Sequence, residues 1–203
     1  MGLRESLFIT SLVLFLSMIG ATLLLDTAVA KPTETVPKSK NSNLKAAADK
    51  LARFNLLSNN PPIPGIKMRD ENGNSVTFDK FQGKVVLFNL WATWCPPCIR
   101  EMPDLNALQA QYKHRGFVVV PVASGRQGKE EPAAFLRKRS LNELTTYYDP
   151  KSYFLRIFGL ETLPITFLID RNGNMRGGAI GILDWGSADA KRLIEALLDE
   201  PKA

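Results

Sequence analysis

Residues 91–105 read WATWCPPCIREMPDL, and this stretch decides the fold. It follows residues 85–90, VVLFNL, an apolar, β-branched and aromatic run that is typical of a strand buried on both faces. From position 97 to about 114 the apolar residues recur at helical spacing, namely Ile99, Met102, Leu105, Leu108 and Tyr112. The stretch therefore marks the passage from a buried strand into a helix.

On either side of this stretch the chain alternates between predicted strands and helices. Upstream, residues 66–68 and 75–78 flank Glu-Asn-Gly-Asn, which indicates a hairpin. The other predicted strands are 117–122, 165–170 and 175–180. The other predicted helices are 130–139, 153–158 and a last one that runs from an N-cap at Ser187 to about 198. The early β-α-β order indicates parallel strands, and the Asn172-Gly173 turn indicates an antiparallel edge. We therefore predict an α/β fold, a mixed sheet with helices on both faces and an N-terminal β-hairpin extension.

The N-terminal residues 1–30 have the pattern of an export segment. An apolar run from Leu7 to Leu25 approaches the ~20 residues that span a bilayer. Residues 28–30, Ala-Val-Ala, fit the small-x-small site of a cleaved signal peptide. Both a signal peptide and a retained membrane anchor remain open, and either one takes the rest of the chain out of the cytoplasm.

Two short segments follow before the main domain, which we expect over residues 61–203. Residues 31–43, KPTETVPKSKNSN, are rich in proline and charge and predict a linker. Residues 44–60 predict a short leading helix, because apolar residues recur at helical spacing until Asn59-Asn60-Pro61-Pro62 stops the pattern. These apolar residues are Leu44, Ala47, Ala48, Leu51, Phe54 and Leu57.

The charge balance is mildly basic. The whole chain carries +6, and removal of residues 1–30 takes away one arginine and two acidic residues, which leaves +7. The lysines and arginines are dispersed and form no dense block. We expect a solvated basic surface and no nucleic-acid partner.

Cys95 and Cys98 are the only cysteines of the chain, and they lie within four positions. As a crosslink this pair would close almost no loop and would stabilise little. At the start of a helix, free N–H groups and the helix dipole favour a thiolate at Cys95, and Pro97 suits the first turn. Cys98 lies about one turn further in, where it can resolve a mixed disulfide. We interpret the pair as a reversible redox switch.

A metal or haem site does not fit this pair. Zinc needs further ligands, but there is no third cysteine and only one histidine, His114, which we expect at the surface. A c-type haem site would need a histidine where Ile99 stands. We therefore expect no metal and no cofactor.

Several other residues are candidates for the site. Glu101 lies three positions after Cys98 and is either a proton acceptor for the second thiol or a solvated carboxylate of the first helical turn. Asn89 lies in the buried strand and can hydrogen-bond near the site. Leu163-Pro164 enters the strand at 165, where a cis peptide bond is possible. Trp91 and Trp94 are expected around the site, and Trp185 in the core or at the rim.

WATWCPPCIREMP, with TLPITFLIDRNGN downstream, resembles the thioredoxin superfamily and, within it, the TlpA/ResA-like branch of exported bacterial thiol-disulfide oxidoreductases. The resemblance covers about residues 64–198. The leading helix and the tail DWGSADAKRLIEAL are most similar to the TlpA group. The resemblance implies a thioredoxin-like domain, and an enzyme that lies on the periplasmic side of the inner membrane, anchored or soluble.

The resemblance also implies roles for individual residues. Cys95 would attack, Cys98 would resolve, and Pro164 would match the cis-proline that binds the partner's backbone, with Leu163 and Trp94 beside it. Glu101 would match the acidic residue that this branch carries after its C-x-x-C. Asn89 falls where cytoplasmic thioredoxins carry a buried aspartate, which makes Glu101 the better candidate for proton transfer.

The function implied by the resemblance is disulfide reduction in an oxidising compartment. The implied partners are protein thiols and disulfides in cytochrome c maturation or cytochrome oxidase assembly, with a membrane thiol carrier as electron donor and the protein itself as a monomer. Three alternatives remain open: a disulfide-forming oxidant, a copper-binding thioredoxin-like chaperone that holds Cu(I) through both thiolates, and a peroxidase that uses Cys95 alone.

Overall fold

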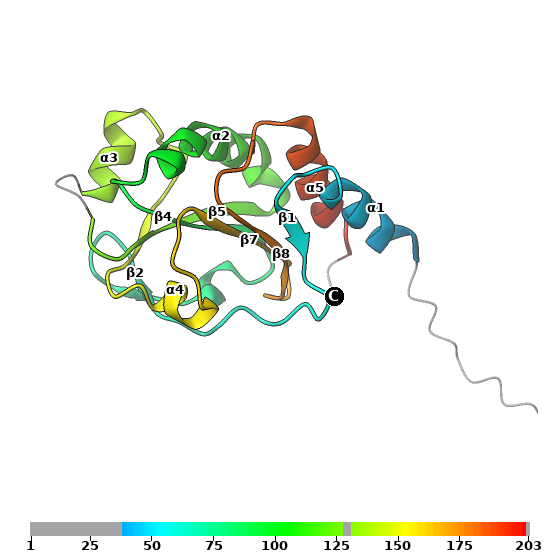
Figure 1. Ribbon diagram of the computed structural model, residues 1–203, viewed down its shortest axis with the longest axis horizontal. Coiled ribbons are helices and arrows are strands. Elements are labelled where there is room, and N and C mark those ends of the chain that lie inside the picture. Colours follow the sequence, from blue (N-terminus) through cyan, green and yellow to red (C-terminus); the bar gives the residue numbers. More distant parts are fainter. Residues whose placement is uncertain (1–37, 128–130, 202–203) are drawn as a thin grey trace, which may run out of the picture. The chain divides into compact units, whose positions relative to one another are not determined.

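The computed structural model describes residues 38–127 and 131–201 (Figure 1). Residues 1–30, for which a signal peptide or anchor was predicted, and residues 31–37 of the predicted linker lie outside the described residues. No helix in the described part of the chain is both long and apolar enough to cross a membrane.

Within the described residues, eight strands form one mixed sheet in the order β1-β8-β7-β4-β5-β6-β2-β3. The strands are β1 Phe54–Leu56, β2 Met68–Arg69, β3 Ser75–Val76, β4 Val85–Trp91, β5 Phe117–Ser124, β6 Tyr147–Asp149, β7 Ile165–Ile169 and β8 Met175–Ile180. β4 pairs in parallel with β5 and antiparallel with β7. All residues of β4 are buried, as the apolar run predicts for a central strand covered on both faces.

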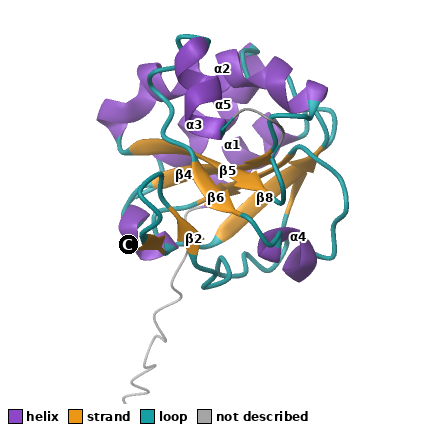
Figure 2. Cartoon of the chain, turned by 90° about the vertical axis from the view of Figure 1, so that its left-hand side faces the viewer, coloured by secondary structure: helices purple, strands orange, loops and turns teal. Residues whose placement is uncertain are grey.

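Helices cover both faces of this sheet (Figure 2). They are α1 Lys38–Ala48, α2 Pro96–Tyr112, α3 Pro132–Lys138, α4 Tyr153–Phe158 and α5 Ala188–Leu198, with short 3-10 turns at Phe78–Phe81 and Lys113–Arg115. One apolar core joins α1, α2, α3 and α5 to one face of the sheet, and a second core lies between the other face, α4 and the first 3-10 turn. The predicted fold class is therefore confirmed.

The predicted leading helix over residues 44–60 is wrong in its extent. α1 begins earlier, at Lys38 inside the predicted linker, and it ends at Ala48. Residues Phe54–Leu56 form β1, which pairs with β8. Arg53 has a positive φ of 76°, which no helix accommodates, and it turns the chain into the strand. Phe54 and Leu57 thus matched helical spacing by chance, because the apolar segment is short.

Glycines in β8 make room for the neighbouring strands β1 and β7. A Cβ built on Gly177 would lie 2.7 Å from the carbonyl oxygen of Asn55 and 2.7 Å from the Phe54 ring. On the other side, a Cβ on Gly178 would lie 2.7 Å from the Phe167 ring. Because β1 approaches Gly177 and β7 approaches Gly178, the pairing of β8 with both strands depends on residues without side chains.

The predicted N-terminal hairpin is present as β2 and β3, which pair antiparallel. It joins the far edge of the sheet through β6, where Arg69 pairs with Tyr148. β6 itself was not predicted, since three residues carry too little alternation to be recognised. The remaining helices and strands lie within a few residues of their predicted positions, and α4 and β8 have the predicted bounds.

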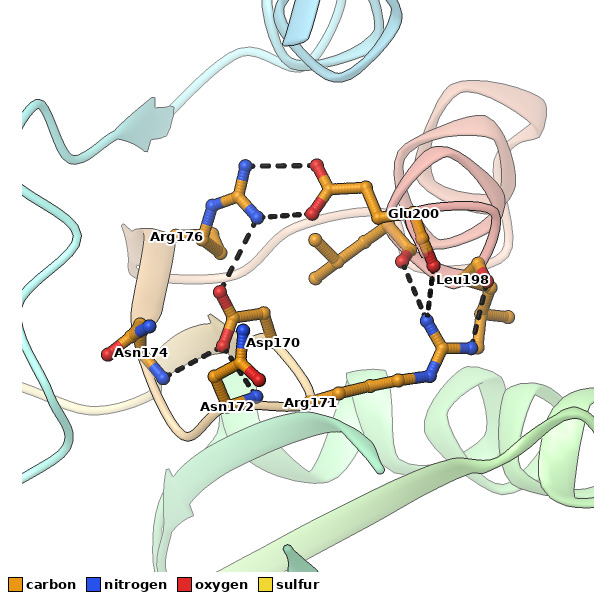
Figure 3. A network of polar contacts seen from close by, with 8 residues as sticks. Asp170, Arg171, Asn172, Asn174, Arg176, Leu198 and Glu200 are labelled. Atoms are coloured by element: carbon orange, nitrogen blue, oxygen red, sulfur yellow. Dashed lines mark hydrogen bonds and ion pairs between the residues drawn. The ribbon is translucent and has the colours of Figure 1, made fainter. Parts of the chain in front are cut away.

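Arg171, in the turn between β7 and β8, and Arg176, in β8, tie the end of α5 to the sheet (Figure 3). Arg171 donates to the carbonyl oxygens of Leu198 at 2.8 Å and Glu200 at 3.0 Å, which satisfies acceptors that a helix leaves free at its C-terminus. Arg176 forms ion pairs with Glu200 and Asp170, and the side chains of all three are largely buried. The C-terminal helix is therefore held to the sheet by charge as well as by its apolar face.

Candidate active site

Cys95 and Cys98 form a disulfide at the point where β4 gives way to α2, with a Cα–Cα distance of 5.3 Å. Cys95 is the N-cap of α2, and its Sγ accepts a hydrogen bond from the backbone N–H of Cys98 at 3.3 Å. Pro96 occupies the first helical turn, where its missing N–H costs nothing. The backbone N–H of Cys98 and the positive dipole end of α2 therefore favour a thiolate at Cys95.

The two cysteines differ in accessibility. Cys95 is 3% exposed, whereas Cys98 is 0% exposed. The surface contact of the pair is therefore made by Cys95, and Cys98 lies behind it in the core, as its position one turn into the helix predicts.

Glu101 is buried in the interior rather than solvated, so the second of the two alternatives for this residue is wrong. It is 1% exposed. Its Oε1 accepts a hydrogen bond of 2.7 Å from the Nδ2 of Asn89 in β4, and the same amide nitrogen also donates to the Oγ1 of Thr166 in β7 at 2.9 Å. The predicted hydrogen bonding of Asn89 near the site is thus present, and its partner is the carboxylate.

Burial raises the pKa of Glu101 from 4.5 to about 7, and the negative charge of Asp104 adds to this effect. The hydrogen bond from Asn89, the Leu183 N–H and the Trp185 indole N–H lower the pKa, but less than burial raises it. A buried carboxyl with this pKa exchanges a proton near neutral pH, which is what a general acid or base needs.

The peptide bond between Leu163 and Pro164 is cis. β7 runs antiparallel to β4, and Ile165 pairs with Leu90 near the end of β4. The cis-proline therefore enters the sheet at the edge where β4 leads into the disulfide. Pro164 is buried and Leu163 is half-buried.

Trp94 is the large apolar side chain beside the disulfide that is exposed, at 57%. Its indole N–H donates to the carbonyl oxygen of Arg126 at 2.8 Å. The neighbouring backbone N–H of Thr93 donates to Oε1 of Gln127 at 3.1 Å, and Nε2 of Gln127 donates to the carbonyl oxygen of Ser124 at 3.0 Å. The segment after β5 thus braces the loop before α2.

Sequence reasoning missed this brace and the partner Thr166. A signal for the brace was present in the turn residues SGRQ at 124–127, directly after a buried strand. Because β4 and β5 are parallel, the segments that follow them lie at the same edge of the sheet and can contact each other. Trp91 and Trp185 are buried as core residues, and Trp185 also lies next to Glu101. His114 is exposed in the turn after α2, as predicted.

This sheet, with a C-x-x-C disulfide at the start of a helix and a cis-proline at the same edge, defines a thioredoxin-like protein. The family model described as Redoxin matches residues 58–194. The thiol-disulfide oxidoreductase ResA of Geobacillus thermodenitrificans is 31% identical over 134 residues, which cover 66% of this chain and 75% of that protein.

Two solved structures extend the likeness. A putative thiol:disulfide interchange protein DsbE from Chlorobium tepidum is 31% identical, with a TM-score of 0.57, over 68% of this chain and 96% of that one. A putative thioredoxin from Neisseria meningitidis is 28% identical, also with a TM-score of 0.57, over 67% of this chain and 89% of that one. The chain belongs to the Redoxin family, in the TlpA/ResA-like branch of the thioredoxin superfamily. It is a thiol-disulfide oxidoreductase.

Proposed function

We propose that this protein is an exported disulfide reductase that acts through Cys95 and Cys98. The observation that carries the proposal is the disulfide at the start of α2 with a buried Glu101 one turn beyond Cys98. This arrangement offers an attacking sulfur, a resolving sulfur and a proton acceptor along the first two turns of α2.

The reaction begins with the reduced pair. The thiolate of Cys95 attacks one sulfur of a substrate disulfide, which forms a mixed disulfide and releases the other substrate sulfur as a thiolate. Cys98 then loses its proton and attacks Sγ of Cys95, which forms the Cys95–Cys98 disulfide and releases the second substrate thiolate. The substrate gains two electrons, and the cysteine pair loses them.

Glu101 is the proposed acceptor for the proton of Cys98. A thiol is a poor nucleophile until a base removes its proton, and Cys98 lies fully buried, away from water that could take this proton. Cys98 and Glu101 are three positions apart on α2 and both are buried, so they are neighbours on the same face of the helix. A carboxyl with a pKa of about 7 can accept this proton and return it to solvent at neutral pH.

Pro164, Leu163 and Trp94 are the proposed substrate-binding residues. The cis-proline lies at the edge of the sheet where β4 leads into the disulfide, and the half-buried Leu163 precedes it. The exposed indole of Trp94 adds an apolar surface next to Cys95. These side chains fit an extended segment of a protein that carries its own disulfide.

The proposed setting is the periplasmic side of a bacterial inner membrane. The apolar run in residues 7–25 supports export, whether it is cleaved as a signal peptide or retained as an anchor. By resemblance, the substrates are apocytochromes c or copper-site proteins of oxidase assembly, the electrons come from a membrane thiol carrier, and the protein works as a monomer.

The reduction potential of the Cys95–Cys98 pair tests the direction of the reaction. The full chain is equilibrated against glutathione or dithiothreitol buffers, and the fraction of disulfide is measured by thiol alkylation. We expect about −200 mV or lower, which makes the reduced pair a usable electron donor. A value near about −120 mV would overturn the reductase proposal and support an oxidant, because such a pair prefers to be reduced.

Trapping tests the roles of the two cysteines. Cys98→Ser should accumulate a mixed disulfide between Cys95 and a protein substrate, because the resolving thiol is gone, whereas Cys95→Ser should accumulate none. Mass spectrometry of the non-reduced complexes reads the result. Equal trapping by both variants would contradict the assigned order of attack. Tight 1:1 binding of Cu(I) by the reduced wild type, without exchange activity, would favour the copper chaperone instead.

A further inference from the structure

The carboxylate of Glu101 has one oxygen engaged and one oxygen open. Oε1 accepts from Asn89 at 2.7 Å. Among the described residues, Oε2 has no hydrogen-bond partner although it is fully buried. An ionised carboxylate in the interior normally has hydrogen bonds to both oxygens, so this oxygen needs a donor when Glu101 loses its proton.

Trp185, next to Glu101, has the complementary unpaired group, a buried N–H donor without an acceptor in the described part of the chain. Trp185 is 0% exposed, and its indole Nε1 also lacks a hydrogen-bond partner among the described residues. The indole N–H faces the Glu101 carboxylate closely enough to lower the pKa of that group, yet it falls short of hydrogen-bond geometry. An indole N–H can only donate, so a nearby anionic oxygen is the partner it suits.

The segment that carries Trp185 follows the acidic face of α2. Leu183 and Trp185 present N–H groups to Glu101, and the backbone N–H of Gly186 lowers the pKa of Asp104, one turn further along α2. A Cβ on Gly186 would lie 2.9 Å from Oδ1 of Asp104, so the backbone passes close to the helix there. The connection between β8 and α5 therefore supplies donors to both carboxylates.

We propose that Trp185 is a positioning residue for Glu101, whose indole N–H closes onto Oε2 when the carboxylate is ionised and is released when Oε2 carries the proton. A protonated Oε2 presents its own O–H, and two donors that face each other form no hydrogen bond. Proton uptake from Cys98 would thus break one specific hydrogen bond. This inference rests on the proposed role of Glu101 as the proton acceptor.

Other charges near Glu101 do not replace this donor. Asp104, from the same helix, raises the pKa of Glu101, and Asp184 in turn raises the pKa of Asp104. Lys191 lowers the pKa of Asp104 and is the cation of this group. From β4 and β7, only the neutral Asn89 and Thr166 join the hydrogen-bond network of the carboxylate. The Trp185 N–H is thus a side-chain donor available to Oε2.

The indole signals of the tryptophans test the proposal without any assay of activity. The chain has three tryptophans, so a ¹H–¹⁵N spectrum of the oxidised full chain shows three indole signals, which single Trp→Phe variants assign. We expect the Trp185 signal to shift between pH 5 and 9 with a midpoint of about 7, and to lose this shift in Glu101→Gln. A Trp185 signal that stays flat while the Glu101 carboxyl carbon titrates would overturn the proposal.

Trp185→Phe provides the second measurement, because it keeps an aromatic ring in the core and removes the indole N–H together with the five-membered ring. We expect the midpoint of Glu101 to rise by about one pH unit. Trp91→Phe is the matched control, since Trp91 is equally buried and donates to Thr146 Oγ1 instead. An equal rise in the control variant would show a general packing effect and overturn the specific role.

The outcomes separate this inference from the proposed function. If Cys98→Ser traps substrates but the Trp185 signal is flat, the reductase stands and the positioning role fails. If the Trp185 signal follows Glu101 but no substrate is trapped, the positioning contact stands as structure and the proposed function fails.

Discussion

Asn89 and Glu101 are twelve positions apart in the chain, on β4 and α2, and they meet in the interior through a hydrogen bond of 2.7 Å. The amide of Asn89 also donates to Thr166, so one side chain of β4 links β7 to the carboxylate on α2. Burial nevertheless dominates and raises the pKa of Glu101 to about 7. This carboxyl therefore couples the stability of the fold to pH.

Glu101 should make the protein less stable as the pH rises. An exposed glutamate has a pKa of 4.5, and that of Glu101 in the folded state is about 7. Between these values the folded state holds a proton that the unfolded state has lost, so the free energy of unfolding falls with rising pH, by up to about 3 kcal/mol from this group. The contribution of Glu101 to the free energy of unfolding is fully present below pH 4.5 and is lost as the pH rises through 7.

Urea unfolding of the oxidised wild type and of Glu101→Gln, measured at intervals from pH 4 to 8.5, checks this dependence. The other ionisable groups are common to both proteins, so the difference between the two curves isolates Glu101. We expect the free energy of unfolding of the variant to rise relative to that of the wild type as the pH increases across this range. A difference that is constant with pH would mean that Glu101 does not hold its proton when folded.

Gly177→Ala and Gly178→Ala should destabilise the edge of the sheet. The new Cβ would lie 2.7 Å from an atom of β1 in the first case and 2.7 Å from the Phe167 ring in the second. We expect each change to lower the free energy of unfolding by about 2 kcal/mol, as overpacked sites do. Gly65→Ala is the control, because a Cβ there meets no atom within 4 Å. Urea titration measures the free energy of unfolding of all three variants. Equal losses of stability in the three would contradict the close approach of β1 and β7 to these glycines.

Arg176→Met should cost roughly 2–3 kcal/mol, because it leaves Asp170 and Glu200 largely buried without their cation. The control is Arg192→Met, which removes an exposed arginine paired with Asp189 and should cost under about 1 kcal/mol. Thermal unfolding of both variants provides the comparison. If the two variants unfold at the same temperature, the contact in Figure 3 does not hold α5 to the sheet.

Trp94→Ala should weaken recognition of protein substrates. Its indole is 57% exposed beside the disulfide, so truncation removes contact area without opening the core. We expect KM for a protein disulfide to rise about 5- to 10-fold, with little change for a small disulfide such as oxidised glutathione. Ile157→Ala on α4 is matched in exposure, at 58%, and should leave both values unchanged. If activity fell equally with the protein disulfide and with oxidised glutathione, Trp94 would act in the chemistry rather than in binding.

The elements with strong local patterns were predictable, and the short edge strands were not. β4 and α2 are long enough for periodicity to identify them, and Ser187 accepts from the backbone N–H of Ala190 as an N-cap should. β1 and β6 have three residues each, and their conformation comes from the strands beside them. Helical spacing in 44–60 misled for this reason, since only contact with β8 makes residues Phe54–Leu56 a strand.

The sequence by itself determined the placement of the C-x-x-C pair between a buried strand and a helix, because this arrangement depends on residues that are neighbours along the chain. It also determined which residues were candidates around the pair. Only the tertiary structure decided that Glu101 is buried, that Asn89 and Trp185 reach it and that its pKa rises, because these groups come from separate segments. Burial and hydrogen bonding are properties of the assembled core, and the charge state of a carboxyl follows from them.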